Sequence, residues 1–71
     1  MSISYKKLWK LLIDKDMTKT QLREKADIAT STLAKLSKDE QVSMDVLLRI
    51  CKTLDCDIAD IMELTKEFKN V

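Results

Sequence analysis

Residues 17–36 of this 71-residue chain read MTKTQLREKADIATSTLAKL and contain two short helical patterns separated by a polar turn. Thr18 is followed three residues later by Gln21, which is the spacing of a capping box and predicts that a helix begins there. This helix is only about two turns long. A second helix is predicted over residues 30–37, so residues 27–29 must form a tight turn between the two.

The second of these helices has one apolar side and one small, basic side. At about 100° per residue, Leu33 and Leu36 fall on one side, whereas Ser31, Ala34 and Lys35 fall on the opposite side. A face of small, hydroxyl-bearing and basic residues can approach another surface closely. On periodicity alone, an ordinary solvated helix face is as good an interpretation as a binding surface.

Apolar residues recur at helical spacing over the rest of the chain as well. The pattern predicts a first helix over about residues 5–13 with Ser4 as its N-cap, and a fourth helix after Ser43. A fifth helix is predicted to begin at the cap residue Asp57. We therefore expect an all-α fold of five short helices around one core, with residues 1–71 forming a single domain.

The composition excludes several classes of function. Histidine and glycine are absent, which excludes His-ligated metal sites, Ser-His or Cys-His nucleophilic pairs and glycine-rich phosphate loops. The two cysteines, Cys51 and Cys56, are too few for a structural zinc site and do not form a C-x-x-C motif. The apolar run Leu11-Leu12-Ile13 is far shorter than the ~20 residues of a membrane span. We expect a cytoplasmic protein that is not an enzyme and has no cofactor, metal, membrane association or small-molecule ligand.

Basic side chains are concentrated near the start of the chain. The net charge is +1, but residues 1–26 carry seven basic and three acidic side chains, whereas residues 43–71 carry four and six. If the partner is a nucleic acid, the first two helices are therefore expected to approach it and the last third of the chain to repel it. We expect few phosphate contacts per subunit and a modest salt dependence.

Residues 17–36 resemble the helix-turn-helix of the Cro and phage-repressor type, often called the Xre family. The apolar positions that match this family's core pattern are Leu22, Ala26, Ile28, Leu33 and Leu36. The segments at 42–50 and 54–62 match the family's fourth and fifth helices, so the resemblance covers about residues 5–63. It implies a five-helix lambda-repressor-like domain, with the helix-turn-helix proper at about residues 18–37.

Two positions depart from the family's usual pattern. Asp27 stands where the family usually has a glycine, and aspartate is one of the few other residues that adopt a left-handed conformation. Arg23 stands where the family usually has a small alanine, so its side chain is expected to extend outward past the helix over 30–37.

The resemblance implies that the helix over 30–37 enters the major groove of DNA with its N-terminal residues facing the bases. The base contacts implied in this way are Thr30, Ser31, Ala34 and Lys35. Phosphate contacts are implied at the start of the preceding helix and beyond the end of the recognition helix, by Lys19, Thr20, Lys38 and Gln41.

The function implied by the resemblance is that of a sequence-specific regulator of transcription that binds double-stranded DNA. A repressor acting as a homodimer on an inverted-repeat operator is favoured. The alternative is a protein-interaction module, antitoxin-like or anti-repressor, that docks another protein through the face of the helix over 30–37. A small and basic face favours DNA over protein.

Several residues outside the helix-turn-helix have more than one interpretation. Trp9 and Cys51 are predicted to belong to the core, whereas Cys56 lies in a turn and has redox sensing as a minor alternative. Residues 64–71 are either a frayed end or part of a dimer contact. A further group either forms a dimer surface or covers the core, namely Met44, Leu48, Leu64 and Phe68.

Overall fold

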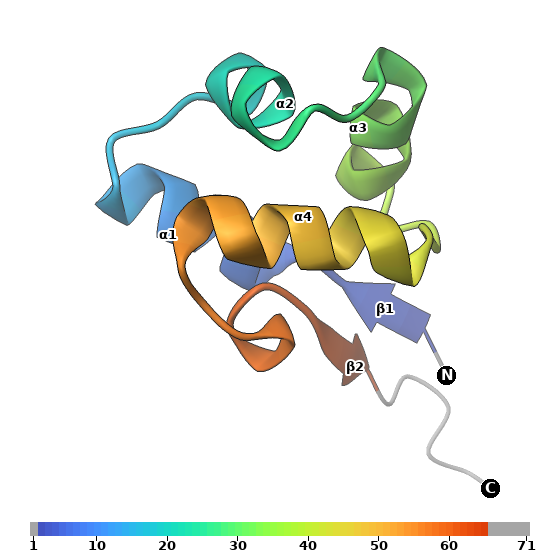
Figure 1. Ribbon diagram of the computed structural model, residues 1–71. Helices are drawn as coiled ribbons and strands as arrows, with labels where there is room; N and C mark the ends of the chain where they lie inside the picture. The colour runs from blue at the N-terminus through green and yellow to red at the C-terminus, as the bar shows by residue number, and fades with distance from the viewer. Residues whose placement is uncertain (1, 66–71) are drawn as a thin grey trace, which may run out of the picture.

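The structure, a computed structural model, describes residues 2–65 (Figure 1). Its elements, in chain order, are β1 (Ser2–Ser4), α1 (Lys6–Asp14), α2 (Lys19–Ala26), α3 (Thr30–Ser37), α4 (Met44–Leu54), the 3-10 turn η1 (Ile58–Asp60) and β2 (Glu63–Thr65). Of the segment 64–71, which was expected to be frayed or part of a dimer contact, Leu64 and Thr65 belong to β2. Residues 66–71, and with them the role suggested for Phe68, lie outside the described residues.

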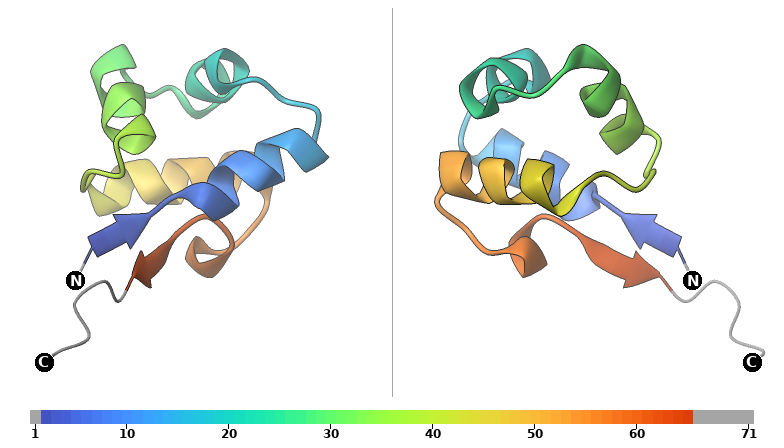
Figure 2. Two further views of the ribbon diagram at one scale, coloured as in Figure 1. Left: turned by 180° about the vertical axis from the view of Figure 1, so that it is seen from behind. Right: turned by 45° about the vertical axis from the view of Figure 1, so that its right-hand side comes forward.

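Helix α4 runs through the middle of the fold. Helices α2 and α3 lie on one side of it, and η1 and the two strands lie on the other (Figure 1). The strands pair antiparallel, with Ile3 opposite Leu64. Turned views show that this small sheet lies well away from α2 (Figure 2). The helix-turn-helix and the strands therefore occupy opposite sides of the molecule.

The expected all-α helix-turn-helix class is supported, and the first four predicted helices are present as α1, α2, α3 and α4. The predicted fifth helix is wrong. The described residues contain four α-helices rather than five, because Ile58–Asp60 form one 3-10 turn and the chain then enters β2. The backbone of Glu63–Thr65 finds its hydrogen-bonding partners in β1, so this segment is a strand rather than a helix. Ser4 is a strand residue and not the N-cap of α1, although its Oγ accepts a hydrogen bond from the Lys6 amide at 3.3 Å.

Four aspartates adopt the left-handed conformation that glycine would usually supply. Asp16, Asp27, Asp39 and Asp55 have φ between 54° and 57°. Asp27 and Asp55 are the C-cap residues of α2 and α4. Aspartate adopts this region at a smaller cost than most residues do, so a chain without glycine can still end its helices sharply. The expectation for Asp27 is confirmed.

Replacing Asp55 with glycine should raise the free energy of unfolding by about 0.5–1 kcal/mol, because glycine has no Cβ to strain this left-handed turn. Asp39→Gly is the matched control, since the Asp39 Oδ1 accepts a hydrogen bond from the Tyr5 amide at 3.0 Å and the variant loses it. Urea denaturation followed by circular dichroism measures both changes. A lower urea midpoint for Asp55→Gly than for the wild type would contradict the strain argument.

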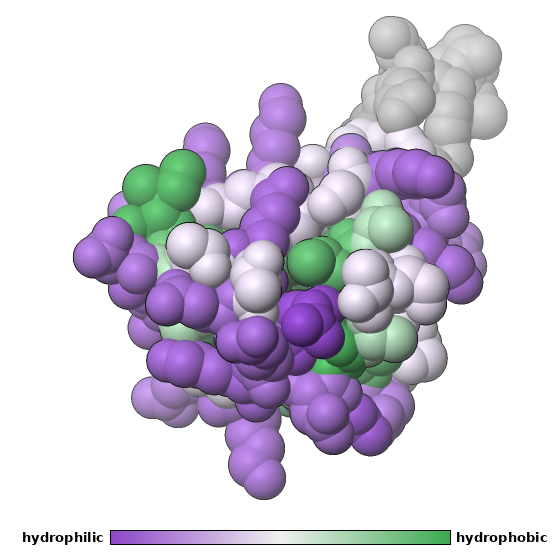
Figure 3. Space-filling model, turned by 90° about the horizontal axis from the view of Figure 1, so that it is seen from above, coloured by the Kyte–Doolittle hydropathy of each residue, from purple (hydrophilic) through white to green (hydrophobic). Residues whose placement is uncertain are grey.

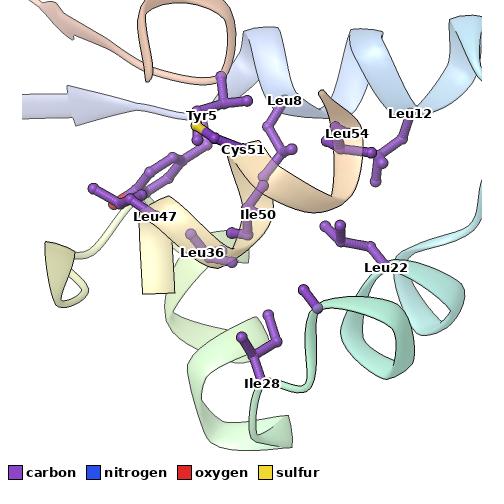
Figure 4. Packing of buried hydrophobic residues seen from close by; sticks show 12 residues of the cluster. Tyr5, Leu8, Leu12, Leu22, Ile28, Leu36, Leu47, Ile50, Cys51 and Leu54 are labelled. Atoms are coloured by element: carbon purple, nitrogen blue, oxygen red, sulfur yellow. The ribbon is translucent and has the colours of Figure 1, made fainter. Parts of the chain in front are cut away.

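All four helices contribute fully buried side chains to one core (Figure 4). Leu8, Leu22, Leu36 and Ile50 are completely buried and come from α1, α2, α3 and α4. Cys51 is buried, as expected. The core prediction for Trp9 is correct only in part, because this residue is half-buried at the edge of the core. Ile13, at the end of the helix predicted over residues 5–13, is 76% exposed.

Candidate nucleic-acid interface

The N-terminus of α2 carries the capping box that the sequence predicts. The Thr18 Oγ1 accepts a hydrogen bond from the Gln21 amide at 3.1 Å, and the Gln21 Oε1 accepts one from the Thr18 amide at 2.9 Å. The amides of Lys19 and Thr20 have no partner within residues 2–65. These exposed amides, at the positive end of the helix dipole, can donate hydrogen bonds to an anion such as a phosphate.

The turn between α2 and α3 is held from two sides. Ile28 is buried beneath it (Figure 4), and the Arg49 Nη1 donates a hydrogen bond to the Asp27 carbonyl oxygen at 2.8 Å. The Arg49 Nε lies 3.1 Å from the Asp45 Oδ2, an ion pair within α4 that restricts the guanidinium. Sequence reasoning missed this role of Arg49. The i,i+4 spacing of the ion pair was visible in the sequence, but the carbonyl acceptor was not.

Helix α3 buries one face and exposes the other. Leu36 is fully buried and Leu33 is half-buried, which fixes the orientation of the helix against the core. The residues expected to contact bases are all exposed, namely Thr30, Ser31, Ala34 and Lys35. Figure 3 shows this side of the molecule, where α2 and α3 lie, and most of it is coloured hydrophilic.

The residues expected to contact phosphates are also exposed, and they fall into two groups. Lys19 and Thr20 form the first turn of α2, whereas Lys38 is the C-cap of α3 and Gln41 lies in the connection to α4. The structure therefore brings the eight candidate residues onto α2, α3 and the segment after α3, with none in the core. Arg23, in the middle of α2, is half-buried, and its Nη2 lies 3.9 Å from the Glu24 Oε2.

A contact between α1 and α2 was not expected from the sequence. The Lys19 Nζ lies 4.1 Å from the centroid of the Trp9 ring, within the range of a cation–π interaction. The two residues are ten positions apart, and no helical spacing relates them. The helical spacing of apolar residues around Trp9 predicted that this side chain belongs to the core. That spacing did not indicate that one face of the indole ring contacts a lysine.

The two thiols lie together near η1, away from the candidate interface. Burial, followed by the neighbouring Cys51 thiol, raises the pKa of Cys56 from 9.0 to about 11. Burial also raises the pKa of Cys51. A raised pKa keeps both thiols protonated and poorly nucleophilic near pH 7, which disfavours the redox-sensing alternative for Cys56.

The wild type should lose more stability than Cys56→Ser as the pH rises from about 8 to 11. The folded chain keeps the Cys56 proton that the unfolded chain loses, so the stabilisation is complete below the unfolded pKa of 9.0 and disappears as the pH approaches the folded value of about 11. Urea midpoints of the two proteins across this range measure the difference. Parallel curves would show that Cys56 titrates alike in both states.

None of the helices in residues 2–65 has the length and apolar character that a membrane-spanning segment requires. The same part of the chain contains no group of three or more histidine, cysteine or acidic residues arranged to hold a metal ion.

Comparison with known proteins relates most of this chain to a described family of DNA-binding domains. A family model described as a Cro/C1-type HTH DNA-binding domain matches residues 7–67. The chain is also similar to a solved structure described as "Crystal structure of transcriptional regulator VanUg, Form II". The two are 56% identical with a TM-score of 0.90, over 93% of this chain and 88% of that chain. No curated protein sequence matches this chain.

Proposed function

Because the chain belongs to the Cro/C1-type helix-turn-helix DNA-binding family, we propose that it is a cytoplasmic repressor of transcription. In this proposal a single helix-turn-helix domain binds an inverted-repeat operator as a homodimer. Membership in the family and the likeness to the transcriptional regulator VanUg support a DNA-binding regulator.

The exposed face of α3 is the observation that carries the proposal. Thr30 and Ser31 are in its first turn, where a recognition helix meets base edges, and their hydroxyls can donate to or accept from any base. Ala34 is small enough to let the helix approach closely and to contact a thymine methyl group. Lys35, one residue further, can donate to the O6 and N7 of guanine or to a phosphate.

Phosphate contacts on both sides of α3 would fix its orientation in the groove. We assign them to Lys19 and Thr20 at the start of α2, and to Lys38 and Gln41 beyond α3. The backbone amides of Lys19 and Thr20, which the capping box leaves without a partner in residues 2–65, support the assignment of these two residues. They add hydrogen-bond donors and a partial positive charge beside the lysine side chain.

Selection from randomised DNA duplexes at near-physiological salt tests specific binding. We expect enrichment of an inverted repeat whose half-sites lie about one helical turn apart. An unenriched pool, with binding that disappears as the salt concentration rises, would mean that charge alone holds the DNA. That outcome would favour the protein-interaction module instead. Repression is then tested by placing the selected sequence over a reporter promoter.

The dimer surface that we propose consists of Met44, Leu48 and Leu64. These residues are 58%, 55% and 58% exposed, so more than half of each is available to a partner. Met44 and Leu48 are one turn apart on α4, and on the same face Asp45 is in the first turn and Lys52 in the last. If two α4 helices pair antiparallel around Leu48, Asp45 of each copy lies near Lys52 of the other, which favours a second copy as the partner.

Replacing Leu48 with glutamate should turn the dimer into a monomer, because it places two acids side by side at the two-fold axis. Ile13→Glu is the matched control, since Ile13 is an apolar residue of α1 that is 76% exposed and lies outside this surface. Sedimentation equilibrium measures the mass of each variant. A dimeric Leu48→Glu protein, or equal dissociation of both variants, would refute this surface.

A further inference from the structure

We infer that Trp9 is a positioning residue that holds the ammonium group of Lys19 at the N-terminus of α2, ready to contact a DNA phosphate. This inference rests on the proposed function, which assigns a phosphate contact to Lys19. It adds α1, which lies outside the helix-turn-helix, to the parts of the chain that determine DNA affinity.

The contact joins an anchored ring to an exposed cation. Trp9 is half-buried and packs against the core, and its neighbours on α1, Leu8 and Leu12, are buried. Lys19 is exposed, and its Nζ lies 4.1 Å from the centre of the indole ring. Because α1 and the core fix the ring, the ring can restrict the lysine and not the reverse.

The ring restricts the ammonium without neutralising its charge. The ion pairs among residues 2–65 join Lys7 to Glu63, Arg23 to Glu24 and Arg49 to Asp45, so Lys19 is not paired with a carboxylate there. A carboxylate partner would compete with a phosphate for the lysine. An aromatic face carries no net charge, and the N–H groups that point away from it remain available as donors.

The ammonium group of Lys19 lies at the N-terminus of α2, a helix end that favours anions. Lys19 is the first residue of α2, and the amides of Lys19 and Thr20 have no partner in the described part of the chain. A free lysine side chain loses most of its rotamer freedom when it binds a phosphate. Trp9 removes part of that freedom before binding, so less entropy is lost when the DNA arrives.

A double-mutant cycle tests the coupling, with the wild type, Trp9→Leu, Lys19→Gln and the double variant bound to the selected operator. Trp9→Leu should weaken binding about two- to five-fold in the wild-type background and have no effect in the Lys19→Gln background. A plot of log K against log salt has a negative slope, and Lys19→Gln should make that slope less steep by about one unit because one phosphate contact is lost. Trp9→Leu should leave the slope unchanged, since the charge of Lys19 remains. Trp9→Phe keeps an aromatic face and should restore most of the affinity.

Equal weakening by Trp9→Leu in both backgrounds would overturn the inference, because it would show a general effect of the ring on the fold. Unchanged binding in both backgrounds would overturn it as well. Circular dichroism at the assay temperature confirms that each variant is folded.

A measurement without DNA separates this inference from the proposed function. In the free protein, nuclear magnetic resonance should show the ε-methylene protons of Lys19 shifted upfield by the indole ring, and Trp9→Leu should abolish the shift. If the shift is absent, the contact with Trp9 is wrong while specific DNA binding can still stand. If the shift is present but the wild type selects no operator, the proposed function fails and the positioning role fails with it.

Discussion

An Ala34→Glu variant should fold like the wild type and bind operator DNA at least about 100-fold more weakly. Ala34 is exposed in the middle of α3, on the face that we propose enters the major groove. A carboxylate there would lie inside the negatively charged groove, against hydrogen-bond acceptors of the bases, and an unfavourable charge in a close interface costs several kcal/mol. Glutamate and alanine are both good helix formers, so α3 itself should keep its structure.

Ala59→Glu provides the matched control for charge. Ala59 is also exposed, but it belongs to η1, on the side of α4 opposite to α2 and α3 (Figure 1). Both variants change the net charge by the same amount, so fluorescence anisotropy titrations with labelled operator separate the effect of position from that of total charge. Equal loss of affinity in the two variants would show that α3 is not the reading element.

The second large effect should be on stability. Replacing Ile50 with alanine should lower the free energy of unfolding by about 2–5 kcal/mol, the cost of removing most of a fully buried side chain and leaving a cavity. Ile50 lies on α4 between the other helices (Figure 4). At roughly 0.05–0.15 kcal/mol per residue, a domain of 71 residues has about 4–11 kcal/mol in total, so the substitution removes a large share of it. The variant should therefore unfold at a clearly lower temperature than the wild type.

Ile13→Ala makes the same chemical change at a residue that is 76% exposed. Its free energy of unfolding should stay within about 0.5 kcal/mol of the wild-type value, because little apolar surface is lost from the core. Urea denaturation monitored by circular dichroism measures both variants. Similar destabilisation by the two substitutions would contradict the burial that the structure assigns to Ile50.

The helix-turn-helix was predictable because its signals are local. The capping box joins Thr18 to Gln21, and the left-handed turn depends on the single residue Asp27. The sequence predicted a helix over residues 30–37, and the structure has α3 at Thr30–Ser37. Each of these features involves residues within four positions of one another, so the sequence displays the cause beside the effect.

The candidate site was predictable only as a set of exposed positions. Its residues came from the alignment of this chain with a family motif, and the structure places all of them on the surface. The sequence did not reveal the groups that support them. Arg49 reaches the Asp27 carbonyl across 22 positions, and Trp9 meets Lys19 across the turn between α1 and α2.

The last third of the chain shows where local pattern fails. Ile58, Ile61 and Met62 have helical spacing, yet this segment forms a 3-10 turn followed by a strand. The strand exists because β1 supplies its hydrogen-bonding partner, and the hydroxyl groups of Ser2 and Thr65 lie 2.6 Å apart although 63 positions separate them. No window of sequence around residue 64 contains that partner.

Sequence alone thus specified the four α-helices, the turn that joins α2 to α3, and the family. Tertiary packing determined the strand pairing, the hydrogen bond from Arg49 to the turn between α2 and α3, the exposure of Ile13 and the contact of Trp9 with Lys19. The division has one physical reason. Helices and caps are stabilised by groups a few residues apart, whereas a strand partner, a tertiary hydrogen bond or a cation–π contact depends on the path of the whole chain.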